Sequence, residues 1–194
     1  MVRREMRTKR IAITGGIGVG KSTACDIISK MGYKVVSADE TYKELLADKN
    51  FVKKINELLD IKSEVFDKNA VSQAVFNDRE KLKTLNEFTH EKIIRKMFEK
   101  TDGEEISFHE VPLLFESGFE KEYNGVIIIK RDLEERINSV SKRSGLSRAE
   151  ILKRIENQVK YENLPKNKHT VIINSDGFEN FAKKVRAVVE EIKG

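Results

Sequence analysis

The fold is decided by residues 11–23, which read Ile11-Ala-Ile-Thr-Gly-Gly-Ile-Gly-Val-Gly-Lys-Ser-Thr23. Gly15, four further residues and then Gly20-Lys21-Ser22 fill the pattern G-x-x-x-x-G-K-[ST], in which successive backbone N–H groups surround nucleotide phosphates. Glycine is needed there because the loop takes φ angles that a Cβ opposes, and because the backbone must approach the phosphates closely. The stretch therefore predicts a phosphate-binding loop.

The residues on either side of this loop support the same interpretation. Residues 10–14 are a mainly apolar, β-branched run, and residues 23–31 carry apolar side chains at helical spacing before Gly32. Strand, loop and helix thus follow in the order that phosphate binding requires, whereas a glycine-rich turn that binds nothing would not need this context. We expect Lys21 to reach the β- and γ-phosphates and Ser22 to give its hydroxyl to Mg²⁺, while the helix N-terminus faces the anion. The nucleotide-binding residues predicted here are Gly16, Gly18, Val19, Gly20, Lys21, Ser22 and Thr23.

Length and composition limit the classes of protein to which the chain can belong. Its 194 residues suffice for one α/β domain with a small helical insertion. The sequence contains no run of about eighteen apolar residues and no signal-type segment, so we expect a cytoplasmic protein without a membrane partner. The net charge of +5 comes from 37 basic and 32 acidic residues, and five of the cations lie in a basic tail over residues 1–10, so a nucleic-acid partner is not required. The single Cys25 cannot form an internal disulfide, and its place early in a helix indicates a small core residue.

A carboxylate follows the second predicted strand. Residues 33–36 are expected to form that strand, and the next three residues lead through Asp39 into a helix over residues 40–46. Ligands of open α/β sheets bind at the carboxyl ends of the strands, so Asp39 is a candidate for chemistry next to the loop. The alternative is that Asp39 only caps the helix, which aspartate does well.

A long helical stretch separates the second and third strands. Residues 48–100 carry two amphipathic faces, and the second face begins at a capping-box pattern from Asn77 to Glu80. Parallel strands need a crossover of only about a dozen residues, so this stretch is an insertion long enough to bind an acceptor. The third strand follows at residues 106–111, and Pro112 then takes the chain out of the sheet.

Two further helices are predicted to form a lid. A buried strand over residues 126–129 precedes capping boxes that start at Asp132 and at Ser147, and a basic, glycine-bearing joint over residues 142–146 connects the two helices. Such a pair could close over a nucleotide and bring Arg143 to the transferring phosphoryl group, or it could be a solvated hairpin with ordinary surface arginines. The last strand is expected at residues 171–174, followed by a helix to Lys193 that Asp176 caps.

In order along the chain, these landmarks resemble those of the dephospho-coenzyme A kinases. The Thr-Gly-Gly-Ile-Gly spelling of the loop, read together with Val-Pro-Leu-Leu-Phe-Glu, is much more specific than the loop pattern alone. Members of this family transfer the γ-phosphoryl group of ATP to the ribose 3′-hydroxyl of dephospho-coenzyme A, which is the last step of coenzyme A synthesis. The matching stretches are residues 14–23, Ala38-Asp39, Val75-Phe76, Leu85 with His90, Val111 to Glu116, Arg143-x-Gly145-x-Ser147, Arg154-x-x-x-Gln158 and Ile172 to Asn174.

The resemblance also implies roles for individual residues. It implies that Asp39 orients or deprotonates the 3′-hydroxyl, and that Lys21 and Arg143 follow the migrating charge. It places Lys68, His90, Pro112 and Glu116 on the acceptor side, and Asn174 with the loop to Gly177 in the adenine pocket. The chain departs from the family pattern at several positions, which include Ser37 for aspartate, Lys68 for arginine, Glu91 for proline and Ser139 for arginine.

The resemblance implies a three-layer α/β P-loop kinase fold with a parallel sheet, a helical acceptor-binding insertion and a helical lid. We expect one domain, with its core at about 9–47, 104–131 and 161–194, the insertion at about 48–103 and the lid at about 132–160. The expected ligands are ATP, Mg²⁺ and dephospho-coenzyme A, and we expect a monomer, with a small homo-oligomer as the alternative. Two other functions stay open: a P-loop kinase of another small acceptor such as a nucleoside or nucleotide, and a nucleotide-binding switch. The base-reading motif Asn-Lys-x-Asp of GTPase switches is absent.

Overall fold

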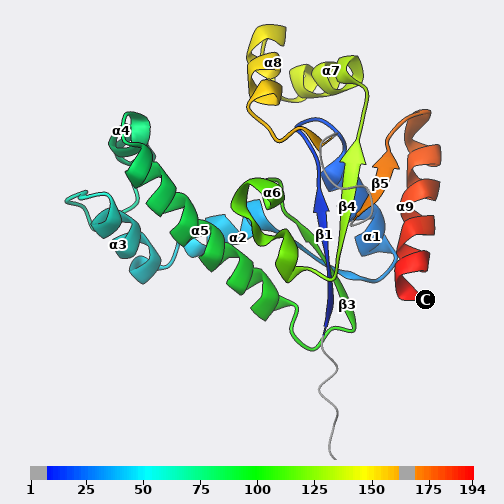
Figure 1. Ribbon diagram of the computed structural model, residues 1–194, viewed down its shortest axis with the longest axis horizontal. Coiled ribbons are helices and arrows are strands. Elements are labelled where there is room, and N and C mark those ends of the chain that lie inside the picture. Colours follow the sequence, from blue (N-terminus) through cyan, green and yellow to red (C-terminus); the bar gives the residue numbers. More distant parts are fainter. Residues whose placement is uncertain (1–7, 162–168) are drawn as a thin grey trace, which may run out of the picture. The chain divides into compact units, whose positions relative to one another are not determined.

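The computed structural model describes residues 8–161 and 169–194 (Figure 1). The chain divides into two compact units, each described by itself below. The first unit comprises the residues up to Val35 and those from Gly103 onward, and the second comprises Val36–Asp102. Three cations of the predicted basic tail, Arg3, Arg4 and Arg7, lie outside the described residues, as does the 162–168 part of the predicted core.

A five-stranded sheet confirms the predicted α/β class. Its strand order is β2-β3-β1-β4-β5, so β1, which leads into the phosphate-binding loop, has a neighbour on each side. The β1–β3, β1–β4 and β4–β5 pairs are parallel, because long crossovers return the chain to the same end of the sheet. The strands are β1 Lys9–Thr14, β2 Lys34–Ser37, β3 Ile106–Glu110, β4 Gly125–Lys130 and β5 Thr170–Ile173.

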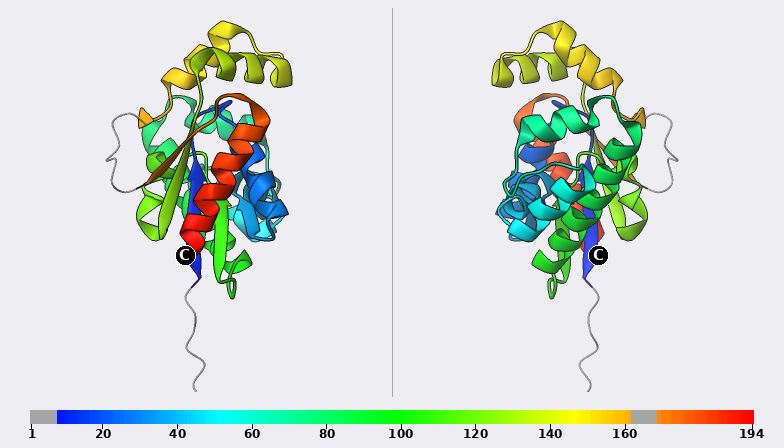
Figure 2. Two further views of the ribbon diagram at one scale, coloured as in Figure 1. Left: turned by 90° about the vertical axis from the view of Figure 1, so that its right-hand side faces the viewer. Right: turned by 90° about the vertical axis from the view of Figure 1, so that its left-hand side faces the viewer.

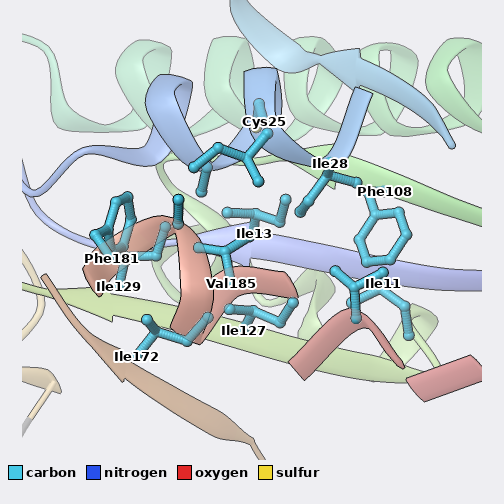
Figure 3. Close-up of a cluster of buried hydrophobic side chains, with 14 of the residues drawn as sticks. Ile11, Ile13, Cys25, Ile28, Phe108, Ile127, Ile129, Ile172, Phe181 and Val185 are labelled. Carbon is cyan, nitrogen blue, oxygen red and sulfur yellow. The ribbon is translucent and has the colours of Figure 1, made fainter. Parts of the chain in front are cut away.

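The main core of the first unit lies between one face of this sheet and two helices, α1 (Lys21–Lys30) and α9 (Gly177–Lys193) (Figure 3). Side chains alternate along each strand, so Ile11 and Ile13 of β1 point into this core. Each fully buried isoleucine contributes about 1.5–3 kcal/mol of hydrophobic stabilisation. Figure 3 shows Ile127, Ile129, Ile172, Phe181 and Val185 in the same cluster.

Cys25 belongs to that core, as its sequence context predicts. It lies on α1 with 8% of its surface exposed, and it packs among the buried residues of the cluster. Burial raises the pKa of the Cys25 thiol, and the nearby carboxylates of Glu110 and Asp26 act in the same direction. The thiol therefore stays protonated and serves as a small apolar group.

A pair of helices in the first unit, α7 (Leu133–Ser144) and α8 (Arg148–Glu156), lies beyond the carboxyl ends of β1 and β4 (Figures 1 and 2). The Ser147 capping box is present in full. At α7 only half of the predicted box forms: Asp132 accepts from the first turn, while Glu135 pairs with Arg131 instead of reaching back. Two short helices, α6 (Leu114–Ser117) and the 3₁₀ helix η1 (Phe119–Glu122), follow β3.

The predicted cap of the closing helix is confirmed in position but not in its side-chain bond. Asp176 occupies the position before α9, but its φ of 62° is left-handed and its side chain makes no capping bond. Its Oδ2 instead accepts a hydrogen bond from Ser175 Oγ at 2.8 Å.

The second unit is helical, as predicted for the stretch between the second and third strands. Its apolar core gathers Phe51, Ile55, Leu59 and Leu85, with further partly buried side chains around them. The long α5 is capped by Asp78, which accepts from Lys81 N at 2.9 Å, so the predicted box at Asn77 is wrong by one residue. Asn77 instead ends the preceding helix. The helices are α2 Ala38–Leu45, α3 Lys49–Leu58, α4 Lys68–Phe76 and α5 Arg79–Lys100.

None of the helices within residues 8–161 and 169–194 is both long and apolar enough to cross a membrane.

Candidate functional site

The phosphate-binding loop connects β1 to α1 and has the backbone that its glycines predict. Gly15 has a φ of 146° and Gly20 a φ of 102°, in the region that side chains with a Cβ avoid. A Cβ on Gly15 would clash with the carbonyl oxygen of Ile129 on β4. The loop is therefore closed on one side by the neighbouring strand, and α1 begins directly after it at Lys21.

Lys21 lies across this loop. Its ammonium donates hydrogen bonds to the carbonyl oxygens of Gly15 at 2.8 Å and Gly16 at 3.1 Å. These contacts hold the positive charge against the loop, where the N–H groups at the start of α1 also favour an anion. The predicted position of Lys21 as a phosphate ligand is compatible with this geometry.

Glu110 meets Ser22, the predicted Mg²⁺ ligand, at the carboxyl end of β3. Ser22 Oγ donates to Glu110 Oε1 at 3.3 Å, because Glu110 ends the strand that pairs with β1 and lies opposite Ile13 in the register. A hydroxyl and a carboxylate are oxygen donors of the kind that Mg²⁺ prefers. The sequence shows Glu110 at the end of a strand, but only the pairing of β3 with β1 brings it to the loop.

A second set of contacts joins the loop to α7 and to the residues that follow α8. Arg136 Nε of α7 donates to the carbonyl oxygen of Ile17 at 2.9 Å, and Gln158 Oε1 accepts from the N–H of Ile17 at 2.9 Å. Neither Arg136 nor Gln158 is among the predicted site residues. Gln158 falls in a stretch that matches the family pattern, which is a usable signal, whereas nothing in the sequence distinguishes Arg136 from the other arginines.

Asn174, predicted in the adenine pocket, follows β5 and reaches the other half of the loop. Its Nδ2 donates to the carbonyl oxygen of Val19 at 2.8 Å, and a Cβ on Gly20 would lie 2.5 Å from the same nitrogen. The backbone N–H of Asn174 also bonds Lys130 O at 2.8 Å, which fixes the residue to the end of β4. Gly177, the first residue of α9, is exposed and has a φ of 87°.

The other predicted residues of the first unit are less enclosed. Arg143 is exposed on the last turn of α7, one residue before the end of the helix. Glu116 is exposed on α6, and its Oε1 accepts from the N–H of Val159 at 3.2 Å. The carbonyl of Pro112 accepts from Thr14 Oγ1 at 3.5 Å, so the turn after β3 touches the end of β1.

Asp39, Lys68 and His90 belong to the second unit. Helix α2 begins at Ala38 with Ser37 in the capping position, so Asp39 lies inside the first turn and the interpretation of Asp39 as a cap is wrong. Its side chain is exposed, as is that of Lys68, the first residue of α4. His90 is half-buried on α5. The carboxylate of Asp39 is exposed and does not cap the helix, so it is available to a ligand.

His109, next to Glu110 on β3, points to the opposite face and is fully buried. Its ring nitrogens lie 3.2 Å from the hydroxyl of Tyr123 and 3.2 Å from Ser107 Oγ. Burial lowers the pKa of His109 to about 3, and the charge of Arg10 acts in the same direction. The imidazole is therefore neutral at physiological pH, and it contacts Tyr123 and Ser107 in the interior of the protein.

Comparisons with known proteins agree with this arrangement. The sequence model of the dephospho-CoA kinase family matches residues 9–180. A dephospho-CoA kinase of Thermus thermophilus is 35% identical over 95% of this chain and 92% of its own length. One of Fusobacterium nucleatum is 32% identical over 94% and 97% of the two chains.

Solved structures show the same fold. A Thermus thermophilus protein superposes with a TM-score of 0.82 at 32% identity, covering 97% of this chain and all of its own. A dephospho-CoA kinase from Campylobacter jejuni gives 0.69 at 28% identity, covering 96% and 98%. A shikimate kinase from Bacteroides thetaiotaomicron gives 0.56 at 13% identity over 95% and 98% of the two chains, which shows the P-loop kinase fold alone.

Proposed function

The chain belongs to the dephospho-CoA kinase family, and we propose that its phosphate-binding loop, Asp39 and helical lid carry out that family's reaction. It is an ATP-dependent kinase that phosphorylates the ribose 3′-hydroxyl of dephospho-CoA to give CoA, the final step of CoA biosynthesis. The observation that carries the assignment of the site is the loop itself, in which Lys21 bridges the carbonyls of Gly15 and Gly16 beside Ser22 and Glu110.

On the donor side, Lys21 and the amides of the loop hold the β- and γ-phosphates. Asp39 accepts a hydrogen bond or the proton from the 3′-hydroxyl, whose oxygen then bonds to the γ-phosphorus as the bond to the β–γ bridging oxygen breaks. Lys21 and Arg143 stabilise the negative charge that moves to the departing ADP. Alignment and charge stabilisation are what phosphoryl transfer requires of a protein, so these few groups suffice.

Mg²⁺ fits the donor set beside the loop. Ser22 and Glu110 supply a hydroxyl and a carboxylate 3.3 Å apart, and either a direct or a water-mediated contact from Glu110 would suit the ion. Within the described residues no three His, Cys, Asp or Glu side chains gather into a metal site. This agrees with an ion held mainly by nucleotide phosphates, where it would neutralise their charge.

The proposed acceptor residues are those that the family resemblance implies. Lys68 and His90 of the second unit, and Pro112 and Glu116 after β3, are assigned to the acceptor, and Asn174 with the turn to Gly177 to the adenine of ATP. The helical insertion is thus the acceptor-binding part and α7 with α8 the lid. We further propose a cytoplasmic monomer that needs neither nucleic acid nor a membrane.

An acceptor panel tests the assignment. Purified full-length protein with Mg²⁺ and ATP is assayed for ADP release with dephospho-CoA, with nucleosides and with nucleoside monophosphates. We expect turnover with dephospho-CoA, and product analysis should place the new phosphate on the 3′-oxygen. Equal turnover of nucleosides together with none of dephospho-CoA would assign the site to another acceptor, and Lys21→Met provides the background rate.

A further inference from the structure

Ile17, in the middle of the phosphate-binding loop, is contacted by α7, by α8 and by the residues that follow α8. Its carbonyl oxygen accepts from Arg136 Nε and its N–H donates to Gln158 Oε1, each at 2.9 Å. Its side chain packs against the apolar cluster of Ile137, Val140 and Ile151 between α7 and α8. The loop therefore packs as one structure with α7, α8 and the residues that follow α8.

The glycines on either side of Ile17 make this close approach possible. A Cβ on Gly16 would clash with the guanidinium of Arg136. A Cβ on Gly18 would lie 2.8 Å from the carbonyl oxygen of Arg136 and 2.8 Å from Val140 Cγ2. Glycine at these two positions therefore allows α7 to pack directly against the loop, in addition to allowing the phosphates to approach it.

We propose that Arg136 is a positioning residue, which acts through Ile17 to hold the loop in its phosphate-binding shape and so couples nucleotide binding to the lid. The proposal rests on the proposed function only in taking the loop as the nucleotide site. It assigns to Arg136 a role distinct from that of Arg143, which lies seven residues further along α7 and is exposed on its last turn.

The contact chemistry explains why an arginine serves here. A guanidinium stays charged and donates in a fixed planar geometry, so Nε can bond Ile17 while Nη2 lies 3.5 Å from Gln158 Oε1. Arg136 is half-buried at this point, where a charge-assisted hydrogen bond is stronger than a neutral one. The backbone N–H and carbonyl of Ile17 thus form one hydrogen-bonded network with the side chains of Gln158 and Arg136, in which each contact depends on the others.

Nucleotide binding without an acceptor tests the proposal. Calorimetry with ATP and with ADP is compared for the wild type and Arg136→Gln, and we expect both dissociation constants to rise by about tenfold, since the shape of the whole loop is affected. Unchanged affinities would reduce Arg136 to a structural residue and overturn the proposal. A loss confined to ATP would overturn it as well, because it would show direct contact with the γ-phosphate.

Further variants separate positioning from general destabilisation. Arg136→Lys keeps a charged donor and should recover part of the affinity. Arg131→Gln, two residues before the same helix, should bind both nucleotides like the wild type. Gln158→Leu should weaken binding too, and the double variant with Arg136→Gln should lose less than the product of the two single effects. Full multiplicative loss in the double variant would contradict a shared path through Ile17.

The Ile17 N–H offers a readout that survives if Arg136→Gln folds poorly. Hydrogen exchange of this amide in folded Arg136→Lys and Gln158→Leu should be faster than in the wild type, while amides in the centre of β1 keep their protection. Unaltered exchange at Ile17 would refute the coupling. If the wild type binds neither ATP nor ADP, the nucleotide site itself is wrong, whereas normal binding by every variant removes only the role of Arg136.

Discussion

The phosphate-binding loop and the predicted acceptor residues of the second unit differ in how firmly the protein holds them. In the loop, the carbonyls of Gly15, Gly16, Ile17 and Val19 all accept hydrogen bonds from side chains that lie on three different elements or their ends. In the second unit, Asp39 and Lys68 are exposed at the first turns of their helices. The donor side is thus prearranged by the fold, while the acceptor side presents charged groups to solvent.

We attribute this difference to the substrates that the two regions are proposed to bind. Triphosphate is a compact anion that a fixed row of amides and one ammonium can match, so a rigid loop binds it without reorganisation. The proposed acceptor residues lie on different helices and include the exposed Asp39 and Lys68, so we expect these two side chains to become ordered when the acceptor binds. Substitutions on the two sides should therefore affect different kinetic quantities.

The largest expected effect is on the donor side, at Lys21. Lys21→Met removes the ammonium that bridges Gly15 and Gly16, and kcat/KM for ATP should fall by about 10³ because developing charge on the phosphates loses its main fixed cation. Steady-state ADP release measures this loss. Lys30→Met, at the exposed end of the same helix, is the matched control. A reduction below tenfold would show that the loop amides alone hold the phosphates.

Asp39 on the acceptor side should give the next largest effect. Asp39→Asn keeps the size of the side chain but removes the proton acceptor, so we expect kcat to fall by about 10² while ATP binding is retained. Calorimetry and single-turnover assays separate these two quantities. Glu40→Gln, the adjacent exposed carboxylate on α2, should behave like the wild type. An equal loss of ATP affinity would erase the contrast between the two sides.

A smaller effect is expected at Glu110. Glu110→Gln retains an acceptor for Ser22 but loses the charge beside the proposed ion, so the Mg²⁺ concentration that supports half-maximal activity should rise roughly 10- to 100-fold. The rate measured over a Mg²⁺ titration gives this value. Glu105→Gln, just before β3, is the control. An unaltered Mg²⁺ requirement would leave Glu110 as a partner of Ser22 only.

The smallest expected effect is on the free energy of unfolding, and it comes from His109 on β3. His109 titrates at about 3 in the folded protein against an ordinary value of 6.5, so between these pKa values the unfolded chain binds more protons and the free energy of unfolding falls as pH falls. The contribution is at most about 1.4 kcal/mol per pH unit. Urea unfolding at several pH values should show a shallower dependence for His109→Gln than for the wild type. Equal slopes for the wild type and for His109→Gln would show that the buried imidazole becomes protonated without opening the sheet.

Much of the fold follows from local pattern. The loop motif, the β-branched strands and the helical spacing of the second unit predict the α/β class, and α1 and β4 lie where the sequence places them. The errors concern ends of helices: Asp78 replaces Asn77, and Asp176 occupies the predicted N-cap position without a side-chain capping bond. Capping depends on one backbone angle at the boundary, and a pattern of residue types does not specify that angle.

The sequence by itself determined the loop, because its glycines, lysine and serine act on atoms within a few residues of one another. Only the tertiary structure decided what surrounds it. Arg136 and Gln158 reach Ile17 from 119 and 141 residues away, and Glu110 reaches Ser22 from 88 residues away. A hydrogen bond to a backbone carbonyl can come from any arginine on a suitably placed turn, so no spacing in the chain identifies the donor. The pairing of β3 with β1 brings Glu110 to the loop, and the packing of α7 on Gly16 and Gly18 brings Arg136 there.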